Sequence, residues 1–160
     1  DAGIVRSTEV WQPVVITQAE LVAEAGAALC ALPGEPEFTY ALAYDHPMIG
    51  REVASFFPTR DDFALELAPA RTFITAEEAQ AAQAAGLLAA GTEENSIVIY
   101  PDHLSEEPAL PQPFARHKLV DLLGDLFLLG RPVIGRVLAF HTGHRHNHEL
   151  ARRLAVQAAT

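Results

Sequence analysis

The sequence predicts a single α+β domain, and three features support this prediction. Hydrophobic residues make up 49% of the 160 positions, which is enough for the core of one domain of ordinary size. From Phe38 to Tyr44, large apolar side chains alternate with smaller or polar ones, which is the period of a half-buried strand. From Phe114 to Leu129 the apolar residues follow helical spacing, and Gly130 ends the run. Strands and a largely buried helix therefore share the chain.

The N-terminal part is predicted to be mainly strands. Two strands are expected on the apolar stretches 14–16 and 27–31, which are rich in β-branched and aliphatic residues. The alternating segment, residues 38–44, is the third strand. A fourth strand covers about 52–57, because Pro58 interrupts it.

Two short helices are expected next. Thr59 is predicted to cap a helix that runs to about Leu67, with two aspartates in its first turn that favour the helix dipole. Thr75 is predicted to cap an alanine-rich helix. Glu78 completes a capping box there, and Gly86 ends this helix.

The C-terminal part mixes both kinds of element. A strand is predicted over 96–100, and the proline-rich stretch 101–113 reads as a connecting loop. The buried helix from Phe114 follows. A last strand is expected over 135–140 and a C-terminal helix over 151–159.

Four polar residues on the helix that begins at Phe114 fall on one narrow arc. At about 100° per residue, His117, Asp121 and Asp125 lie at roughly 0°, 40° and 80°. Lys118, the only lysine of the chain, lies at roughly 100°. A carboxylate on such a helix is costly unless it is paired or bound to a cation. We therefore treat this polar stripe as a candidate site.

Within the stripe, His117 and Asp121 stand one turn apart and can both contact one ion. Imidazole nitrogen with carboxylate oxygen suits zinc, which needs about four ligands, so at least one protein ligand is missing. A solvated ion pair is the alternative. Asp and His are weaker helix formers than the Glu, Lys or Arg typical of an exposed stripe, which disfavours that alternative.

A histidine cluster near the C-terminus is the place to seek a third ligand or a proton-transfer group, since four of the seven histidines lie between Phe140 and His148. A surface loop that enters a helix is the alternative interpretation. Asp125 is expected to hold a histidine of this cluster charged, as a general acid requires. Thr72, between two predicted helices, is either an ordinary cap or a donor to a developing oxyanion.

Composition argues against several classes of function. The net charge of −10, with 11 basic against 21 acidic residues, disfavours a nucleic-acid binder. Cys30 is the only cysteine, so no internal disulfide is possible and a reducing cytoplasm is expected. No apolar run reaches the length of about 20 residues that spans a bilayer, and Asp1 begins no recognisable signal peptide.

Four segments together resemble the UDP-3-O-acyl-N-acetylglucosamine deacetylases, which are zinc hydrolases of lipid A synthesis. The resemblance covers essentially the whole chain, with the four motifs in family order. The motifs are Tyr44-Asp45-His46-Pro47-Met48-Ile49-Gly50, Ala68-Pro69-Ala70-Arg71-Thr72-Phe73, Phe114-Ala115-Arg116-His117-Lys118-Leu119-Val120-Asp121-Leu122-Leu123-Gly124-Asp125 and Thr142-Gly143-His144.

The resemblance implies an architecture. Members of this family have two similar domains, each a small mixed or antiparallel sheet layered against two helices. By similarity, residues 1–8 are the end of a linker from an absent first domain, and residues 9–160 are the second domain. Residues 74–100 resemble the strand-helix-strand insert of that second domain.

The cofactor that the resemblance implies is Zn²⁺, with His117 and Asp121 as ligands. The third ligand and the general base would come from the first domain.

The resemblance also implies roles for individual residues. His144 would protonate the leaving amine while Asp125 orients it, and Thr72 would polarise the acyl carbonyl. Lys118 would contact the anionic portion of the substrate UDP-3-O-acyl-N-acetylglucosamine. The remaining substrate-binding candidates flank the site or line a passage for the acyl chain: Phe73, Tyr44, Ala76, Ala79, Leu88, Ser96 and Val98.

Two further readings of the chain stay open. It could be a non-catalytic module for nucleotide sugar or metal, or a structural metal-binding domain, although structural zinc prefers thiolates. An isolated second domain is expected to be inactive. Activity of the isolated chain would require another histidine, such as His141 or His146, to complete the site. An isolated second domain would also expose its apolar interface, so a dimer is possible.

Overall fold

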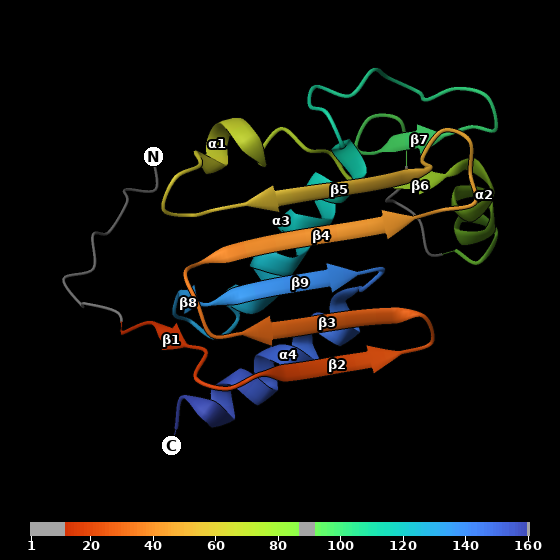
Figure 1. Ribbon diagram of the computed structural model, residues 1–160. Helices are drawn as coiled ribbons and strands as arrows, with labels where there is room; N and C mark the ends of the chain where they lie inside the picture. The colour runs from red at the N-terminus through yellow and green to blue at the C-terminus, as the bar shows by residue number, and fades with distance from the viewer. Residues whose placement is uncertain (1–11, 87–91, 160) are drawn as a thin grey trace, which may run out of the picture.

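The structure is a computed structural model that describes residues 12–86 and 92–159 (Figure 1). Its centre is a five-stranded sheet in the order β2-β3-β9-β4-β5. All neighbours in this sheet pair antiparallel except β4 and β9, which are parallel. The strands are β2 (Glu20–Glu24), β3 (Ala27–Leu32), β4 (Glu37–Ala43), β5 (Arg51–Phe56) and β9 (Arg136–Phe140).

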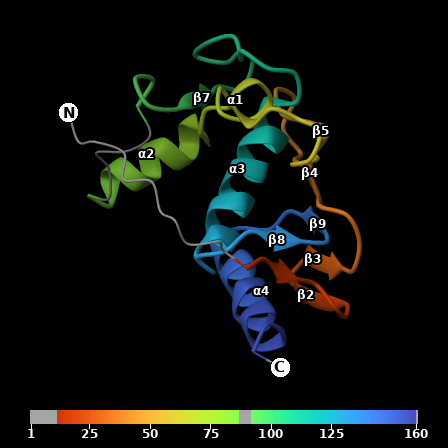
Figure 2. The same cartoon turned by 90° about the vertical axis from the view of Figure 1, so that its left-hand side faces the viewer.

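Two helices cover one face of this mixed sheet (Figure 2). Helix α3 (Pro113–Phe127) packs on β4 and β5, and α4 (His144–Gln157) packs on β2 and β3. The two helices also contact each other. The predicted α+β fold, a two-layer sandwich of a small sheet and two helices, is confirmed.

The core lies between these two layers. Phe38, Tyr40 and Leu42 alternate inward along β4, as their two-residue period predicts. They face α3, whose buried residues recur at helical spacing. On the two helices, the fully buried leucines are Leu119 and Leu122 of α3 and Leu150 and Leu154 of α4.

A strand-helix-strand unit stands at one end of the sandwich, as predicted for the insert. It comprises β6 (Phe73–Thr75), α2 (Ala76–Ala84) and β7 (Ile97–Ile99), and its two strands are parallel. The capping box of Thr75 and Glu78 is present. Gly86, at φ +70°, takes the left-handed conformation that follows the helix end.

Two small elements complete the fold. β1 (Val14–Val15) pairs in parallel with β8 (Val133–Ile134). The short helix α1 (Phe63–Glu66) follows β5. Thr59 is not its cap, contrary to prediction: Asp62 caps it by accepting a hydrogen bond from Ala64 N at 2.8 Å.

Other boundaries differ from those predicted. The C-terminal helix begins at His144 instead of residue 151, so part of the histidine cluster is helical. The strands β2 and β8 were not predicted, and β6 was expected only through the resemblance of residues 74–100 to a strand-helix-strand insert. The helix α3 was predicted to be largely buried, and this is wrong at its C-terminal end. Phe127 is 57% exposed there, and Leu128, the next residue, is 72% exposed.

Among the residues that the structure describes, no helix is long and apolar enough to cross a membrane.

Candidate active site

The sheet fixes the start of the helix that carries the polar stripe. Gln112, at φ +47°, offers no side-chain cap to α3, and Pro113 occupies its first turn. Glu52 of β5 supplies the acceptor instead, because its Oε2 lies 2.8 Å from Ala115 N. Phe114 packs edge-on against Phe73 of the insert, with 4.8 Å between the ring centroids. The helix is thereby held between the sheet and the insert.

His117 and Asp121 lie together and away from bulk solvent. Nε2 of His117 is 3.4 Å from Oδ1 of Asp121, and the side chains are only 15% and 18% exposed. These exposures contradict the alternative of a solvated pair on an open helix face.

The contact of Nδ1 of His117 determines which of the two ring nitrogens carries the proton. Nδ1 lies 3.3 Å from the carbonyl oxygen of Ala70, and a carbonyl can only accept, so Nδ1 carries the proton. Burial lowers the pKa of His117 and outweighs the opposing effect of Asp121. In the neutral ring Nε2 then presents a lone pair to the carboxylate. Two acceptors converge here, and a hydrogen bond between them is impossible without a further proton.

This donor pair fits zinc. Two ligand atoms at about 2.0–2.2 Å from a tetrahedral ion lie about 3.4 Å apart, which matches the 3.4 Å between Nε2 of His117 and Oδ1 of Asp121. A metal-ligating histidine typically donates its other N–H to a carbonyl or carboxylate, as His117 does toward Ala70.

Lys118 lies beside this pair. Its Nζ donates to Oδ2 of Asp121 at 3.0 Å and stands 5.7 Å from the centroid of the Phe73 ring. Lys118 thus contacts Oδ2 of Asp121, while the other oxygen, Oδ1, is the one that lies toward His117.

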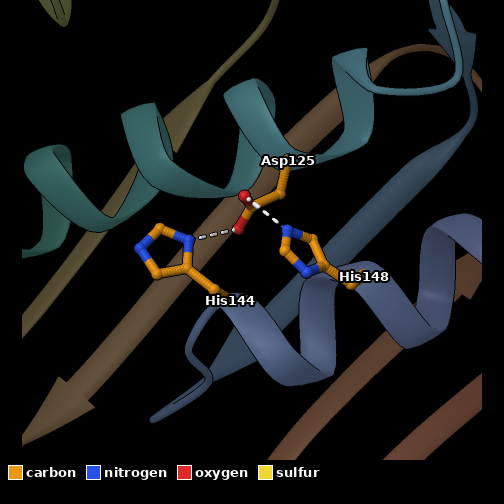
Figure 3. Close-up of side chains that lie close together, drawn as sticks. All are labelled: Asp125, His144 and His148. Atoms are coloured by element: carbon orange, nitrogen blue, oxygen red, sulfur yellow. Dashed lines mark hydrogen bonds and ion pairs between the residues drawn. The ribbon is translucent and has the colours of Figure 1, made fainter.

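The last stripe residue, Asp125, is buried and points from α3 to α4 (Figure 3). Its Oδ2 accepts from Nδ1 of His144 at 2.7 Å and from Nδ2 of Asn147 at 2.9 Å. Its Oδ1 accepts from Nε2 of His148 at 3.0 Å. Burial raises the pKa of Asp125, but the donors outweigh it, so the carboxyl pKa lies below its ordinary value.

Asp125, His144 and His148 could in principle surround a metal ion, since their ligand atoms lie within 4.8 Å of one another. The separations of 2.7 and 3.0 Å between nitrogen and oxygen are hydrogen-bond lengths. They are shorter than the spacing of about 3.4 Å between two zinc ligands. The distances in this cluster are therefore those of hydrogen bonds, whereas the separation in the His117–Asp121 pair fits two ligands of one metal ion. Nε2 of His144 remains available to exchange a proton.

The loop before α4 helps to place His144. The hydroxyl of Tyr40 on β4 donates to the carbonyl oxygen of Thr142, and burial raises the pKa of Tyr40 to about 12. The hydroxyl therefore stays protonated and keeps donating at physiological pH. Gly143 then begins the helix as its N-cap residue.

The other predicted residues near the stripe lie at the edge of the insert. Thr72 is exposed and precedes β6, and its carbonyl accepts from Ile97 N at 2.8 Å. Its neighbour Phe73 packs edge-on against both His117 and Tyr44, with centroid distances of 6.1 and 6.4 Å. The structure thus brings Phe73 and Tyr44 to the His117 side of α3.

The predicted passage residues are only partly gathered. Ala76, Ala79 and Val98 line one cavity of about 240 Å³ between α2 and β7. Ser96 is buried, but its hydroxyl bonds Oδ1 of Asn95 and it does not line that cavity. Leu88 lies outside the described residues.

Two histidines considered as a further ligand are engaged with backbone. Nε2 of His141 lies 2.9 Å from the N–H and 2.6 Å from the oxygen of Ala43. Nδ1 of His146 accepts from Gly143 N at 3.3 Å. His148, in contrast, joins the site through Asp125, although no individual role was predicted for it. The sequence signal is its spacing of four residues from His144. This spacing places the two side chains on one face only if the segment is helical.

Comparison with known proteins gives one consistent result. A model of the family described as UDP-3-O-acyl N-acetylglycosamine deacetylase matches residues 1–156. The UDP-3-O-acyl-N-acetylglucosamine deacetylase of Campylobacter curvus is 33% identical over 161 residues, covering 99% of this chain and 54% of that protein. The enzyme of that name from Synechocystis is 34% identical and covers 90% and 53%. The Leptospira biflexa protein of that name is 33% identical and covers 98% and 52%. The chain spans about half the length of these relatives.

Proposed function

The chain belongs to the UDP-3-O-acyl N-acetylglycosamine deacetylase family, as its sequence motifs predicted, and from this premise we propose that it supplies the C-terminal half of a zinc-dependent deacetylase site. In this proposal residues 1–8 are linker, residues 9–160 are the second domain and residues 74–100 are its insert. The reaction is hydrolysis of the N-acetyl amide of UDP-3-O-acyl-N-acetylglucosamine, a step of lipid A synthesis that releases acetate.

The observation that carries the proposal is the convergence of two acceptors, Nε2 of His117 and Oδ1 of Asp121, at 3.4 Å. These two atoms would hold Zn²⁺, with a third ligand and the general base supplied by the first domain. When bound, the metal would supply a Lewis acid that polarises the amide carbonyl and lowers the pKa of water. His117 is suited to this role because it is neutral and because Ala70 fixes its tautomer.

The proton-transfer group lies one helical turn along the stripe. As the amide C–N bond breaks, His144 would give the proton of Nε2 to the departing nitrogen, while the water oxygen stays on the acetyl carbon. Asp125 would orient the ring through Nδ1 and stabilise its charged form. The hydroxyl of Thr72 would donate to the oxygen on which negative charge develops.

The remaining predicted residues would bind the substrate. Lys118 would meet its anionic portion, and Phe73 with Tyr44 would form an aromatic wall beside the sugar. The cavity at Ala76, Ala79 and Val98 would accept part of the acyl chain.

Zinc content and deacetylation, measured on the longer polypeptide that includes the first domain, test this proposal. His117→Ala and Asp121→Ala should each lose most of the bound zinc and lower kcat/KM by at least about 10³-fold, because a missing ligand weakens the metal and its Lewis acidity. His103→Ala is the matched control, since it removes an exposed histidine paired with Asp102. Full zinc content and activity in both ligand variants would refute the proposed site.

The 160-residue chain alone provides a second test. It should bind zinc weakly and release no acetate, because two ligands from one helix do not complete a catalytic site. Substrate binding without acetate release by the longer polypeptide would favour a non-catalytic nucleotide-sugar module.

The cytoplasmic location and the dimer through an exposed face remain predictions. Analytical ultracentrifugation tests whether the dimer forms.

A further inference from the structure

Asp125 is held at both carboxylate oxygens by one face of α4 (Figure 3). Oδ2 receives Nδ1 of His144 and Nδ2 of Asn147, at 2.7 and 2.9 Å. Oδ1 receives Nε2 of His148 at 3.0 Å. Since His144, Asn147 and His148 are separated by three and four positions on one helix, their side chains reach the same carboxylate.

The three donors do not have equivalent surroundings. The side chain of Asp125 is 12% exposed, whereas those of His148 and His144 are 39% and 64% exposed, so the two histidines lie on the solvent side of the carboxylate. Asn147 is almost fully buried. Without His148, Oδ1 would lose its protein donor and the carboxylate would be free to rotate about its last side-chain bond.

We propose that His148 is a positioning residue: its Nε2–H fixes Oδ1 of Asp125 so that Oδ2 is aimed at Nδ1 of His144. The catalytic consequence rests on the proposed function, but the positioning itself does not. The hydrogen bond of His148 is to Asp125, so its effect on His144 passes through the carboxylate it holds.

The ¹⁵N NMR shifts of the His144 ring nitrogens, measured on the neutral ring in the 160-residue chain, test the proposal without requiring activity. In wild type the proton should reside on Nδ1, because Oδ2 of Asp125 accepts from it. In His148→Ala the Nδ1–H tautomer should lose population to the Nε2–H tautomer, because the carboxylate is no longer held in place. His148→Gln, whose amide nitrogen also donates, should restore the wild-type tautomer, and His103→Ala, which removes another Asp–His pair, should leave it unchanged. An unchanged tautomer in His148→Ala, or equal changes in the Ala and Gln variants, would overturn the proposal.

Kinetics of the longer polypeptide then separate positioning from general damage. His148→Ala should lower kcat by about tenfold with KM within about twofold, because only the proton-transfer step is affected. His148→Gln should return kcat to within about twofold of wild type, because its amide can donate to Oδ1 of Asp125 in place of the ring. If no variant and no wild type releases acetate, the proposed function fails while the NMR result still decides the role of His148.

Discussion

Glu52 on β5 accepts a hydrogen bond from the backbone N–H of Ala115 on α3, with 2.8 Å between oxygen and nitrogen. The sheet thus provides the cap that the helix lacks from its own N-cap residue, Gln112. His117 and Asp121 lie one turn apart on the same helix. This contact between distant segments therefore fixes how far the two candidate metal ligands stand from the sheet.

Replacing Glu52 should separate capping from charge. Glu52→Ala removes the acceptor and should lower the free energy of unfolding at pH 7 by about 1 kcal/mol, the typical cost of a lost helix cap. Glu52→Gln keeps an oxygen acceptor without a buried charge and should be as stable as wild type or more so. Urea denaturation measures both variants, with the exposed Glu35→Ala as control.

The pH dependence of the Glu52 variants gives a sharper check. Burial raises the pKa of Glu52 above 4.5, against the opposing hydrogen bonds from Ala115 and Phe114. The folded state therefore binds the proton more tightly than the unfolded state does, and wild-type stability should fall relative to Glu52→Gln as pH rises above 4.5. A difference between the two proteins that does not change with pH would contradict this.

Asp125 should give the opposite pH dependence. Its donors hold the folded pKa below 3.8 despite burial, so its contribution to stability is complete above pH 3.8 and is lost as the pH falls through the lowered folded value. Asp125→Asn should cost about 2 kcal/mol at pH 7, because buried hydrogen bonds to a charged group are lost. The difference from wild type should shrink in acid. Chemical denaturation at pH 7 and below pH 3.8 measures the difference in the free energy of unfolding. Asp102→Asn, at an exposed aspartate, should show little effect.

Much of the site was readable from the sequence because it lies on one helix. The spacing of His117, Asp121 and Asp125 depends only on helical geometry, and the apolar residues around them identify the helix. The pairing of Asp125 with His144 joins two helices. It was anticipated from chemistry and the family resemblance, since spacing alone does not relate the two segments.

Elements formed by long-range pairing were harder to predict. β2 is an edge strand whose only buried residue is Val22, and its hairpin turn places Ala25 at φ +48°, without the Asn-Gly signal of such turns. β6 gains its identity from pairing with β7, across the whole of α2. The first turns of α4 were read as a loop because histidines are poor helix formers, whereas Asp125 holds two of them in place.

Lys118 offers a test of substrate recognition apart from metal binding. Lys118→Ala removes the cation that donates to Oδ2 of Asp121 but neither atom of the converging pair. In the longer polypeptide its zinc content should stay at the wild-type level while KM rises about tenfold, as expected when one charge contact to an anionic substrate is lost. Lys118→Arg should recover part of the affinity. A loss of zinc in Lys118→Ala with KM unchanged would show that the lysine serves the metal ligands instead.

Under the proposed function, the cavity beside α2 predicts a preference among acyl chains of different length. Ala76 and Ala79 leave about 240 Å³ open there, so we expect long acyl chains to be accepted. Ala76→Ile and Ala79→Ile should each lower kcat/KM for a long-chain substrate by about tenfold, since the contacts of one methylene group are worth about 1–3 kcal/mol. For a short-chain substrate kcat/KM should change by less than about twofold, because such a chain does not fill the cavity.

Ala81→Ile, at an exposed position on the same helix, is the control for damage to α2. Because Ala79 is only 7% exposed, its variant also risks overpacking, and the thermal midpoint of each protein must be compared first. Equal losses for both chain lengths in Ala76→Ile, with an unchanged thermal midpoint, would exclude this cavity as the acyl passage.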